Sequence, residues 1–278
     1  MHFSKNMSSY FFNNNIKTKS HFYKMYVVVS VNDQKYKPLA HWTVHKNRKL
    51  YCERHGYVLK HYEDGAESLV GKPMRAGNPP IPKDHVPIGW SKIYAVKEAL
   101  KDPNVEWVFS SETDVMITNM TIKLEDIVNE CTKDANVHVI ISADCNGINC
   151  GNMFIKNSPI GNAFIDTIIA GLPLYREWYL FENQLIQDLC IGTHLTEQGV
   201  KAGGTLWGRV IKVLPQRVFN SYDYKNIPLL KDRPHYKDIL GHDGQWKEGD
   251  FIIQWPSTDL DYRIKEAEEL YNSQKIIS

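Results

Sequence analysis

Short apolar runs and longer amphipathic stretches alternate along this chain. The β-branched run at 25–31 is typical of a strand buried on both faces. Residues 38–56 follow a helical pattern that ends at a glycine, a favoured helix stop, and 57–62 predict a second strand. A strand, a helix and a strand in this order predict a right-handed parallel crossover at the amino terminus.

The same alternation continues to the carboxyl end and predicts a single α/β domain. Residues 63–87 are rich in Gly and Pro and predict a long loop, which in a compact domain is often functional. We expect a polar, disordered extension at 1–24 and a folded domain at 25–278. Further helices are expected at about 91–100, 124–128, 161–170, 181–189 and 263–273, strands at 106–117, 137–142, 153–155, 210–214 and 251–255, and a loop at 149–152.

Composition narrows the classes of partner. Of the 278 residues, 42% are hydrophobic and 23% are charged, and the net charge is +1. These values favour neither nucleic acid nor an anionic membrane as a partner, so we expect small or neutral molecules and no nucleic acid. The 7 Trp and 15 Tyr residues offer aromatic platforms of the kind that bind sugar rings, although most such residues are simply buried.

The cysteines and the amino terminus bear on location. Five cysteines without a CxxC pair argue against a disulfide framework and favour reduced thiols in an intracellular compartment. No stretch approaches the roughly 18 to 20 apolar residues of a membrane span, and the segment before Met25 lacks the apolar core of a secretory signal. Translation could equally begin at Met25. We therefore expect a soluble, cytoplasmic protein without a membrane span.

Two acidic residues separated by one residue, Glu112 and Asp114, follow an apolar run. Side chains alternate along an extended strand, so both carboxylates are expected on one side of a strand end. Such a pair suits a hard divalent cation that leaves its other coordination positions to substrate phosphates. A strand end with solvated charges is the commoner meaning of an acidic triplet, and this alternative stays open.

The end of the first predicted strand carries another candidate residue. In α/β sheets, nucleotides bind in the crevice at the carboxyl ends of the strands. Ser30 occupies that position and is a candidate donor contact. An ordinary strand-end serine fits the position equally well.

Four segments of the chain form a recognisable series. They are 89–96 (GWSKIYAV), 106–120 (EWVFSSETDVMITNM), 144–158 (DCNGINCGNMFIKNS) and 249–255 (GDFIIQW), joined by 181–184 (FENQ) and 215–222 (PQRVFNSY). In order and spacing the series resembles glycosyltransferase family thirty-four, the galactosyl, mannosyl and xylosyl transferases of yeast mannan and plant xyloglucan synthesis. The resemblance covers about 25–255.

The resemblance implies a single GT-A fold, a Rossmann-like nucleotide-sugar-binding domain with a mixed central sheet. It implies that a hexose or pentose (galactose, mannose, xylose or glucose) moves from a UDP- or GDP-sugar donor to a glycan acceptor, with retention at the anomeric carbon. It also implies a divalent cation, Mn²⁺ or Mg²⁺. Family relatives are usually anchored in the Golgi by an amino-terminal membrane helix, a feature not found in this sequence.

By resemblance, the metal ligands are Glu112, Asp114 and Gln254. The family's acid pair is usually Asp-Ser-Asp, and the longer Glu112 must shift the ion or fold back, so Asp114 is the firmer ligand. The family supplies a histidine in its late strand where this chain has Gln254. A glutamine carbonyl oxygen would favour magnesium or calcium relative to the softer preference of a histidine site.

The same resemblance makes Lys92, Asp144, Asn149 and Gly151 candidate donor contacts. Lys92 would face the negative charge that develops on the leaving diphosphate, and an exposed helical lysine is the alternative. Gly151 allows close backbone approach, and Asn149 is able to bond sugar hydroxyls. Asp144 would accept from a hydroxyl or, alternatively, form a turn.

Glu182, Asn183 and Gln184 align with the family segment beside the reacting carbon and are the candidate catalytic residues. In the family's same-face displacement the leaving phosphate helps to deprotonate the acceptor, so nearby side chains stabilise a cationic sugar. Asn183 stands where relatives carry an acid, which argues against a covalent carboxylate intermediate. A capping cluster at a helix N-terminus is the structural alternative for these residues.

The altered ligand positions leave a second function open. A degenerate family member would bind a nucleotide sugar or glycan without turning it over. An inverting GT-A enzyme or a nucleotidyltransferase with a similar acid-pair strand is the third interpretation. Release of free nucleotide from a panel of nucleotide sugars separates an enzyme from a binding protein.

Overall fold

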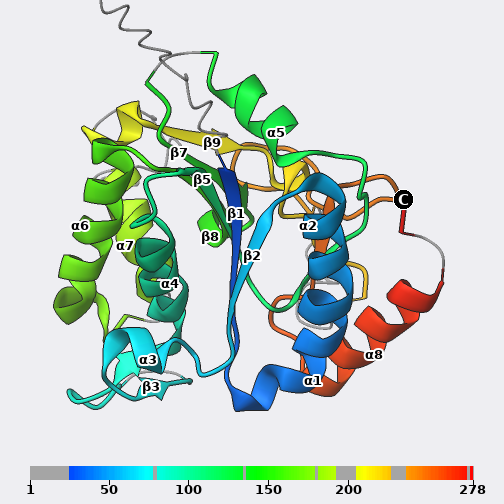
Figure 1. Cartoon of the computed structure of the whole chain (residues 1–278), viewed down its shortest axis with the longest axis horizontal. Coiled ribbons are helices and arrows are strands. Elements are labelled where there is room, and N and C mark those ends of the chain that lie inside the picture. Colours follow the sequence, from blue (N-terminus) through cyan, green and yellow to red (C-terminus); the bar gives the residue numbers. More distant parts are fainter. Residues whose placement is uncertain are drawn as a thin grey trace, which may run out of the picture.

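A mixed β-sheet forms the centre of the molecule, between two layers of helices (Figure 1). Within the described residues its strand order is β2-β1-β5-β8-β7-β9. The predicted α/β domain with a mixed central sheet is therefore confirmed. This computed structural model describes residues 25–77, 80–133, 136–178, 181–191, 205–226, 236–273 and 276–277, and the predicted extension at 1–24 lies outside them.

Strand direction brings the candidate residues to one edge of this sheet. β1 is parallel to β2 and β5, and β7 is parallel to β9, whereas β8 runs antiparallel between β5 and β7. The carboxyl ends of β1, β5 and β7 therefore meet at the same edge as the first residues of β8, where α/β sheets bind ligands. The strands are β1 (Met25–Val31), β2 (Val58–Tyr62), β5 (Val105–Ser111), β7 (Val139–Asp144), β8 (Gly147–Lys156) and β9 (Ile211–Leu214).

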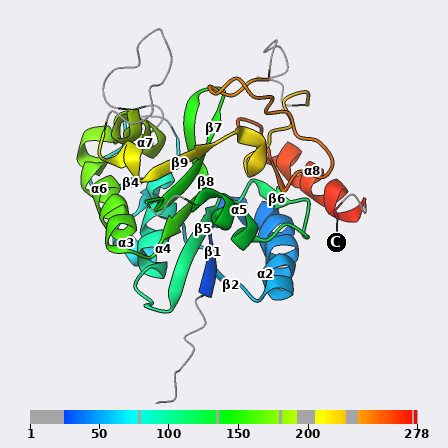
Figure 2. The same ribbon diagram turned by 90° about the horizontal axis from the view of Figure 1, so that it is seen from above.

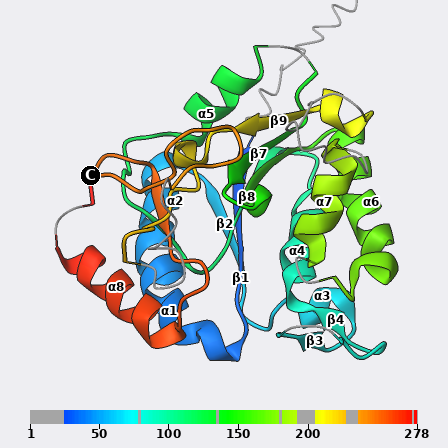
Figure 3. The ribbon, with the colours of Figure 1, turned by 180° about the vertical axis from the view of Figure 1, so that it is seen from behind.

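Helices cover both faces of the sheet, as Figures 1 and 2 show. One layer holds α4 (Ser91–Ala99), α6 (Pro159–Tyr175) and α7 (Phe181–Ile191), and the other holds α1 (Lys37–Ala40), α2 (Lys49–His55), α5 (Leu124–Cys131) and α8 (Leu260–Asn272). The last helix packs against the first one (Figure 3). Among the described helices, none combines the length and the apolar character that a membrane span requires.

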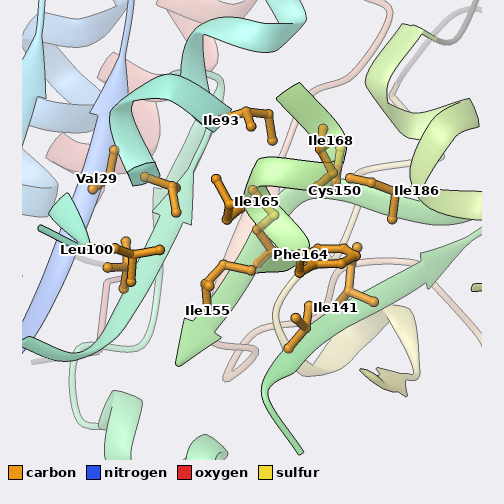
Figure 4. Close-up of a cluster of buried hydrophobic side chains, with 14 of the residues drawn as sticks. Val29, Ile93, Leu100, Ile141, Cys150, Ile155, Phe164, Ile165, Ile168 and Ile186 are labelled. Atoms are coloured by element: carbon orange, nitrogen blue, oxygen red, sulfur yellow. The ribbon is translucent and has the colours of Figure 1, made fainter. Parts of the chain in front are cut away.

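Alternate side chains of the central strands enter two separate cores. Val27 and Val29 of β1 face α4, whereas Tyr26 and Val28 face α2. Figure 4 shows the first core, where Phe164 of α6 lies among aliphatic side chains of the sheet and of α4 and α7. Burying each large apolar side chain of this kind contributes roughly 1.5–3 kcal/mol. All five cysteines lie among the described residues as free thiols, four of them buried.

The first predicted helix is present, but its middle is π-helical. α1 passes into η2 (His41–Arg48), a π-helical segment that continues into α2, and Gly56 ends the helix with a φ of +71°. Arg48, the last residue of η2, is fully buried and donates to the carbonyl oxygens of Glu112 (2.9 Å) and Val115 (3.0 Å). The first helix therefore holds the chain on both sides of the acid pair.

Two predicted loops contain regular structure. The segment 63–87 includes α3 (Glu67–Val70) and a parallel pair formed by β3 (Met74–Arg75) and β4 (Val86–Pro87). The predicted loop at 149–152 belongs instead to β8, which pairs with β7 on one side and β5 on the other. The segment 149–152 is rich in Asn and Gly, which are uncommon in strands, so the sequence did not predict a strand there. A bulge opposite Ile141 and Ser142 accommodates these residues.

Candidate active site

The acid pair lies in a tight turn between two strands. β5 ends at Ser111 and β6 (Val115–Ile117) begins at Val115, so Glu112 and Asp114 occupy the connection. The Glu112 amide donates to the carbonyl oxygen of Gly151 at 3.1 Å. Our explanation of the pair by strand alternation was wrong, because the turn, not an extended strand end, sets the direction of both carboxylates.

Gln254 reaches both acids from a second short sheet. It ends β10 (Ile252–Gln254), which pairs antiparallel with β6 and places Gln254 opposite Val115. Its Nε2 donates to Glu112 Oε2 at 3.0 Å and to Asp114 Oδ1 at 3.2 Å. The three side chains predicted to hold a metal thus converge on one point, although they are separated by up to 142 positions in sequence.

The chemistry of these three side chains fits a divalent cation such as Mn²⁺ or Mg²⁺. Two carboxylates and one carboxamide supply hard oxygen ligands. The amide nitrogen of Gln254 faces the acids, so its oxygen would reach a cation after a half-turn of the amide. Asn152 donates to the Gln254 oxygen at 3.4 Å, and its own Oδ1 is buried without a hydrogen-bond partner in the described structure.

On one side of the acid pair, Glu112 is ion-paired with a buried lysine. Lys92 Nζ donates to Glu112 Oε1 at 2.6 Å and lies 2.9 Å from Glu182 Oε1. Burial by itself lowers the pKa of Lys92, but the neighbouring thiol and carboxylates raise this pKa well above its usual value. Burial raises the pKa of Glu112, but the Lys92 ammonium outweighs it and holds this pKa below the usual range.

On the other side, Asp114 faces the carboxyl-terminal helix. Arg263 of α8 lies 3.3 Å from Asp114 Oδ2. Burial raises the pKa of Asp114 to about 6 despite the opposing effect of Arg263, and the charge of Glu112 adds to the increase. Asp114 is therefore the acid whose charge responds most readily to pH or to a bound cation.

Two cavities meet at the acid pair in the described part of the chain. The first, of about 310 Å³, lies at the ends of β1 and β5 and is bounded by Asn32, Tyr36 and Lys92. The second, of about 270 Å³, lies at the ends of β7 and β8. Glu112, Asp114 and Arg263 line both cavities. A ligand that spans the two cavities would therefore pass the acid pair.

Two of the predicted donor contacts lie in the second cavity. The carboxylate of Asp144 accepts hydrogen bonds from Asn149 Nδ2 and from the Tyr222 hydroxyl, both at 2.9 Å. Gly151 lies between this group and the acids, and a Cβ atom there would come within 2.9 Å of Glu112 Oε2. A side chain at position 151 would therefore push the Glu112 carboxylate out of its present position.

The other two predicted donor contacts differ in position. Lys92 lines the first cavity, but its ammonium group is already paired with the carboxylates of Glu112 and Glu182. The hydroxyl of Ser30 donates to the carbonyl oxygen of Ser111 at 2.9 Å and accepts from Arg48. Ser30 is not among the described residues that line the two cavities. Its hydrogen bonds instead hold the end of β5, where the acid turn begins.

The three candidate catalytic residues point in different directions from the start of α7. Asn183 lines the second cavity, and its Oδ1 accepts from the Cys150 amide at 2.8 Å. Glu182 is buried against Lys92, and Gln184 donates to Asp188 one turn along the helix at 2.9 Å. The contacts of these side chains therefore tie α7 to α4 and β8, and Asn183 is the member that faces a cavity.

Sequence reasoning missed three residues of the site. Arg263 belongs to a helix predicted only as a charged closing helix, and its contact with Asp114 spans 149 positions. Tyr222 was noticed as part of a segment without a role, and its hydroxyl bonds the Asp144 carboxylate. Arg48 is a buried cation on the helix before β2. No local pattern distinguishes these residues from ordinary surface residues.

Comparison with known proteins gives the chain a family. The galactosyl transferase GMA12/MNN10 family matches residues 23–133 and 128–257. The chain is 24% identical over 214 residues to the alpha-1,2-galactosyltransferase of Schizosaccharomyces pombe, which covers 64% of this chain and 50% of that protein. It is 21% identical over 216 residues to the probable alpha-1,6-mannosyltransferase MNN10 of Saccharomyces cerevisiae, which covers 68% and 52%. The chain spans about half the length of these curated relatives.

A solved structure gives the same fold. A glycosyltransferase involved in the glycosylation of the major capsid of PBCV-1 superposes with a TM-score of 0.54 and covers 87% of this chain and 98% of that chain. At 14% identity this likeness shows the fold alone. The chain therefore has the GT-A fold and, as its series of sequence segments predicted, belongs to the galactosyl transferase GMA12/MNN10 family.

Proposed function

We propose that this chain is a metal-dependent, retaining glycosyltransferase that moves a hexose or pentose from a UDP- or GDP-sugar to a glycan acceptor. The observation that carries the proposal is the position of Glu112 and Asp114 at the junction of the two cavities. A diphosphate links the two halves of a nucleotide sugar. It would lie at this junction if the nucleoside entered one cavity and the sugar the other.

The first cavity is suited to the nucleoside. It opens at the carboxyl ends of two parallel strands, the usual nucleotide site of α/β sheets. Val31, Tyr36 and Ile88 give it apolar and aromatic walls for a base, and Asp33 offers a carboxylate to ribose hydroxyls. The sequence expectation of a nucleotide-sugar donor is consistent with this lining.

The second cavity is suited to the sugar. Asp144, Asn149 and Asn183 line it with carboxylate and amide groups, which match the hydroxyls of a sugar ring. The Tyr222 hydroxyl and the Asn149 amide hold the Asp144 carboxylate in place.

Residues at the junction of the two cavities would stabilise the leaving diphosphate. Arg263 pairs with Asp114 and lines both cavities, so its guanidinium would transfer to the donor phosphates when they arrive. Lys92 keeps Glu112 and Glu182 in position on the opposite side. A cation held by Glu112, Asp114 and Gln254 would neutralise charge on the diphosphate as a Lewis acid.

The proposed retention of configuration rests on Asn183, the candidate catalytic residue that lines the second cavity. Asn183 is an amide, and its oxygen already accepts from the Cys150 backbone, so it is a poor nucleophile. The Glu182 carboxylate is buried in its ion pair with Lys92. These positions support a same-face displacement in which the leaving phosphate assists deprotonation of the acceptor.

The alternative is a family member that binds the donor without turnover. It is favoured by one observation: Lys92 and Arg263 already pair with the two acids, and Gln254 donates to both. In this case the site would be stable without a cation and would bind nucleotide in EDTA.

Nucleotide release from a panel of donors tests the proposed activity. The panel starts with UDP-galactose and GDP-mannose, the donors suggested by relatives named as galactosyl and mannosyl transferases, and adds UDP-glucose and UDP-xylose. We expect Mn²⁺-dependent release of UDP or GDP from at least one donor, because slow hydrolysis proceeds without an acceptor. Tight donor binding with no release from any donor, with or without simple glycoside acceptors, would support the non-catalytic alternative.

A further inference from the structure

A second group of metal-ligating side chains lies apart from the acid pair, beside the edge strand of the sheet. His45 belongs to η2, and His61 and Glu63 belong to the end of β2 and the residue that follows it. Each offers one ligand atom, and these atoms all lie within 4.8 Å of one another. The family segments described above contain none of these three residues, so the proposed transfer reaction does not account for the group.

The three side chains already contact one another. His45 Nε2 lies 2.9 Å from Glu63 Oε1, and the rings of His45 and His61 are 4.9 Å apart at an angle of 66°. Tetrahedral Zn²⁺ bonds of about 2.0–2.2 Å place ligand atoms about 3.4 Å apart, so shifts of roughly an ångström would close the group on an ion. Since the side chains of His45 and Glu63 are 46% and 42% exposed, solvent can reach the remaining position.

A hydrogen bond fixes the orientation of the second imidazole. His61 Nε2 bonds to Asn32 Oδ1, and the Asn32 amide is held in turn because its Nδ2 donates to the Asp33 carbonyl oxygen at 2.8 Å. Because the Asn32 oxygen accepts, His61 Nε2 carries the proton and Nδ1 keeps its lone pair. An imidazole that donates its other N–H to an oxygen is the usual arrangement of a zinc ligand.

We propose that His45, His61 and Glu63 bind a Zn²⁺ ion, with solvent as the fourth ligand. Two imidazoles and one carboxylate form a ligand set that zinc prefers over magnesium or calcium. The ion would link η2 to the end of β2. Through Asn32, which lines the first cavity, it would also fix one wall of the pocket proposed for the nucleoside.

One neighbouring cation competes with the ion. Lys37 Nζ lies 3.5 Å from Glu63 Oε2, and its side chain is 44% exposed, so it is free to turn into solvent. Arg48 adds positive charge nearby, but its guanidinium is committed to backbone carbonyls of the acid turn. Removal of the Lys37 charge should therefore strengthen zinc binding at this group.

Zinc affinity of full-length, tag-free variants tests the site. Each is built on Asp114→Ala, which disables the acid pair, and is titrated with Zn²⁺ against a chromophoric chelator. We expect one site. Loss of the His61 or His45 imidazole should weaken it by more than the roughly 10–100-fold that loss of an outer hydrogen-bond partner costs. Lys37→Gln should tighten it.

The control is His41→Ala, an exposed histidine one turn away on the same π-helical segment, which should leave the affinity unchanged. His45→Ala guards against a folding defect in His61→Ala, because His45 is exposed and its loss should not disturb the core. The proposal is overturned if the parent binds no zinc at micromolar concentration, or if His45→Ala and His41→Ala bind it equally well.

Discussion

The two acids of the candidate site are one residue apart, yet they contact opposite parts of the molecule. Glu112 faces α4, where Lys92 is enclosed between two carboxylates and the pKa of Glu112 is held below its usual range. Asp114 faces α8, where a single arginine only partly offsets burial and the pKa rises to about 6. The α4 side is thus held in place by ion pairs within the fold, whereas the α8 side is poised to respond to a ligand.

The largest expected effect comes from removing the responsive acid. Asp114→Ala should abolish metal-dependent release of nucleotide while the protein stays folded, because the lost carboxylate serves the diphosphate and its cation rather than packing. Nucleotide release and circular dichroism on the same preparation check this. Glu130→Ala removes an exposed acid that is paired with Lys133 on the surface, and it should leave release unchanged. Turnover in Asp114→Ala at the wild-type rate would remove Asp114 from the metal ligands.

On the α4 side, removal of the buried lysine should instead lower the free energy of unfolding. Lys92→Met leaves Glu112 and Glu182 without their shared cation, and breaking a buried pair by removing one partner costs about 3–5 kcal/mol. The free energy of unfolding in urea measures the loss. The matched control is Lys97→Met on the same helix, whose ion pair with Asp166 is more exposed and is worth less than about 1 kcal/mol. Equal stability of both variants would mean that Lys92 is not a structural cation.

pH should affect the α8 side through Asp114. The pKa of Asp114 is about 6 in the folded protein, compared with 3.8 for an unperturbed aspartate. Protonation of Asp114 therefore stabilises the folded state relative to the unfolded state below about pH 4, and this stabilisation is lost as the pH rises through 6. Cation binding follows the opposite course, because the cation needs the ionised carboxylate. Mn²⁺ affinity should fall about tenfold per pH unit below 6 and level off above 7. Calorimetry across this range checks it, and an Asp114→Asn variant with the same steep profile would assign the titration elsewhere.

The smallest expected effect is a change of metal preference. Gln254→His should raise affinity for Mn²⁺ relative to Mg²⁺, because an imidazole nitrogen is a better ligand for the softer ion. Titration of both ions into the wild type and the variant, with nucleotide present, measures the ratio. A ratio that stays the same would show that position 254 does not face the metal. Asn152→Ala tests the same position in another way, because it removes the amide that donates to the Gln254 oxygen.

The sequence predicted the elements well because periodic burial controls them. The strand at 25–31 and the helix that stops at Gly56 follow directly from β-branched runs and from a glycine with positive φ. The predicted loop at 149–152 failed because an Asn- and Gly-rich segment carries no strand signal of its own, and pairing with two neighbouring strands supplies its conformation. Tertiary contacts overrode local preference there.

The site was predicted less completely, and the reason is distance along the chain. Glu112, Asp114 and Gln254 were named from their segments, and the fold brings them together. The ion pair of Lys92 with Glu182 joins two helices, and that of Arg263 with Asp114 joins a helix to the acid turn; the partners are far apart in sequence, and no periodicity encodes such contacts. Glu182 was expected beside the reacting sugar; this role stays a prediction, and the side chain lies buried in an ion pair with Lys92.

Binding of a nucleoside diphosphate with and without a cation tests the central claim most directly. UDP and GDP are titrated calorimetrically into the wild type in Mn²⁺ and in EDTA, and then into Asp114→Ala under the same two conditions. The account predicts that one of the two nucleotides binds the wild type more tightly in Mn²⁺, and that this difference disappears in the variant. Equal affinity of the wild type in Mn²⁺ and EDTA would contradict a cation-bridged diphosphate at the junction of the two cavities.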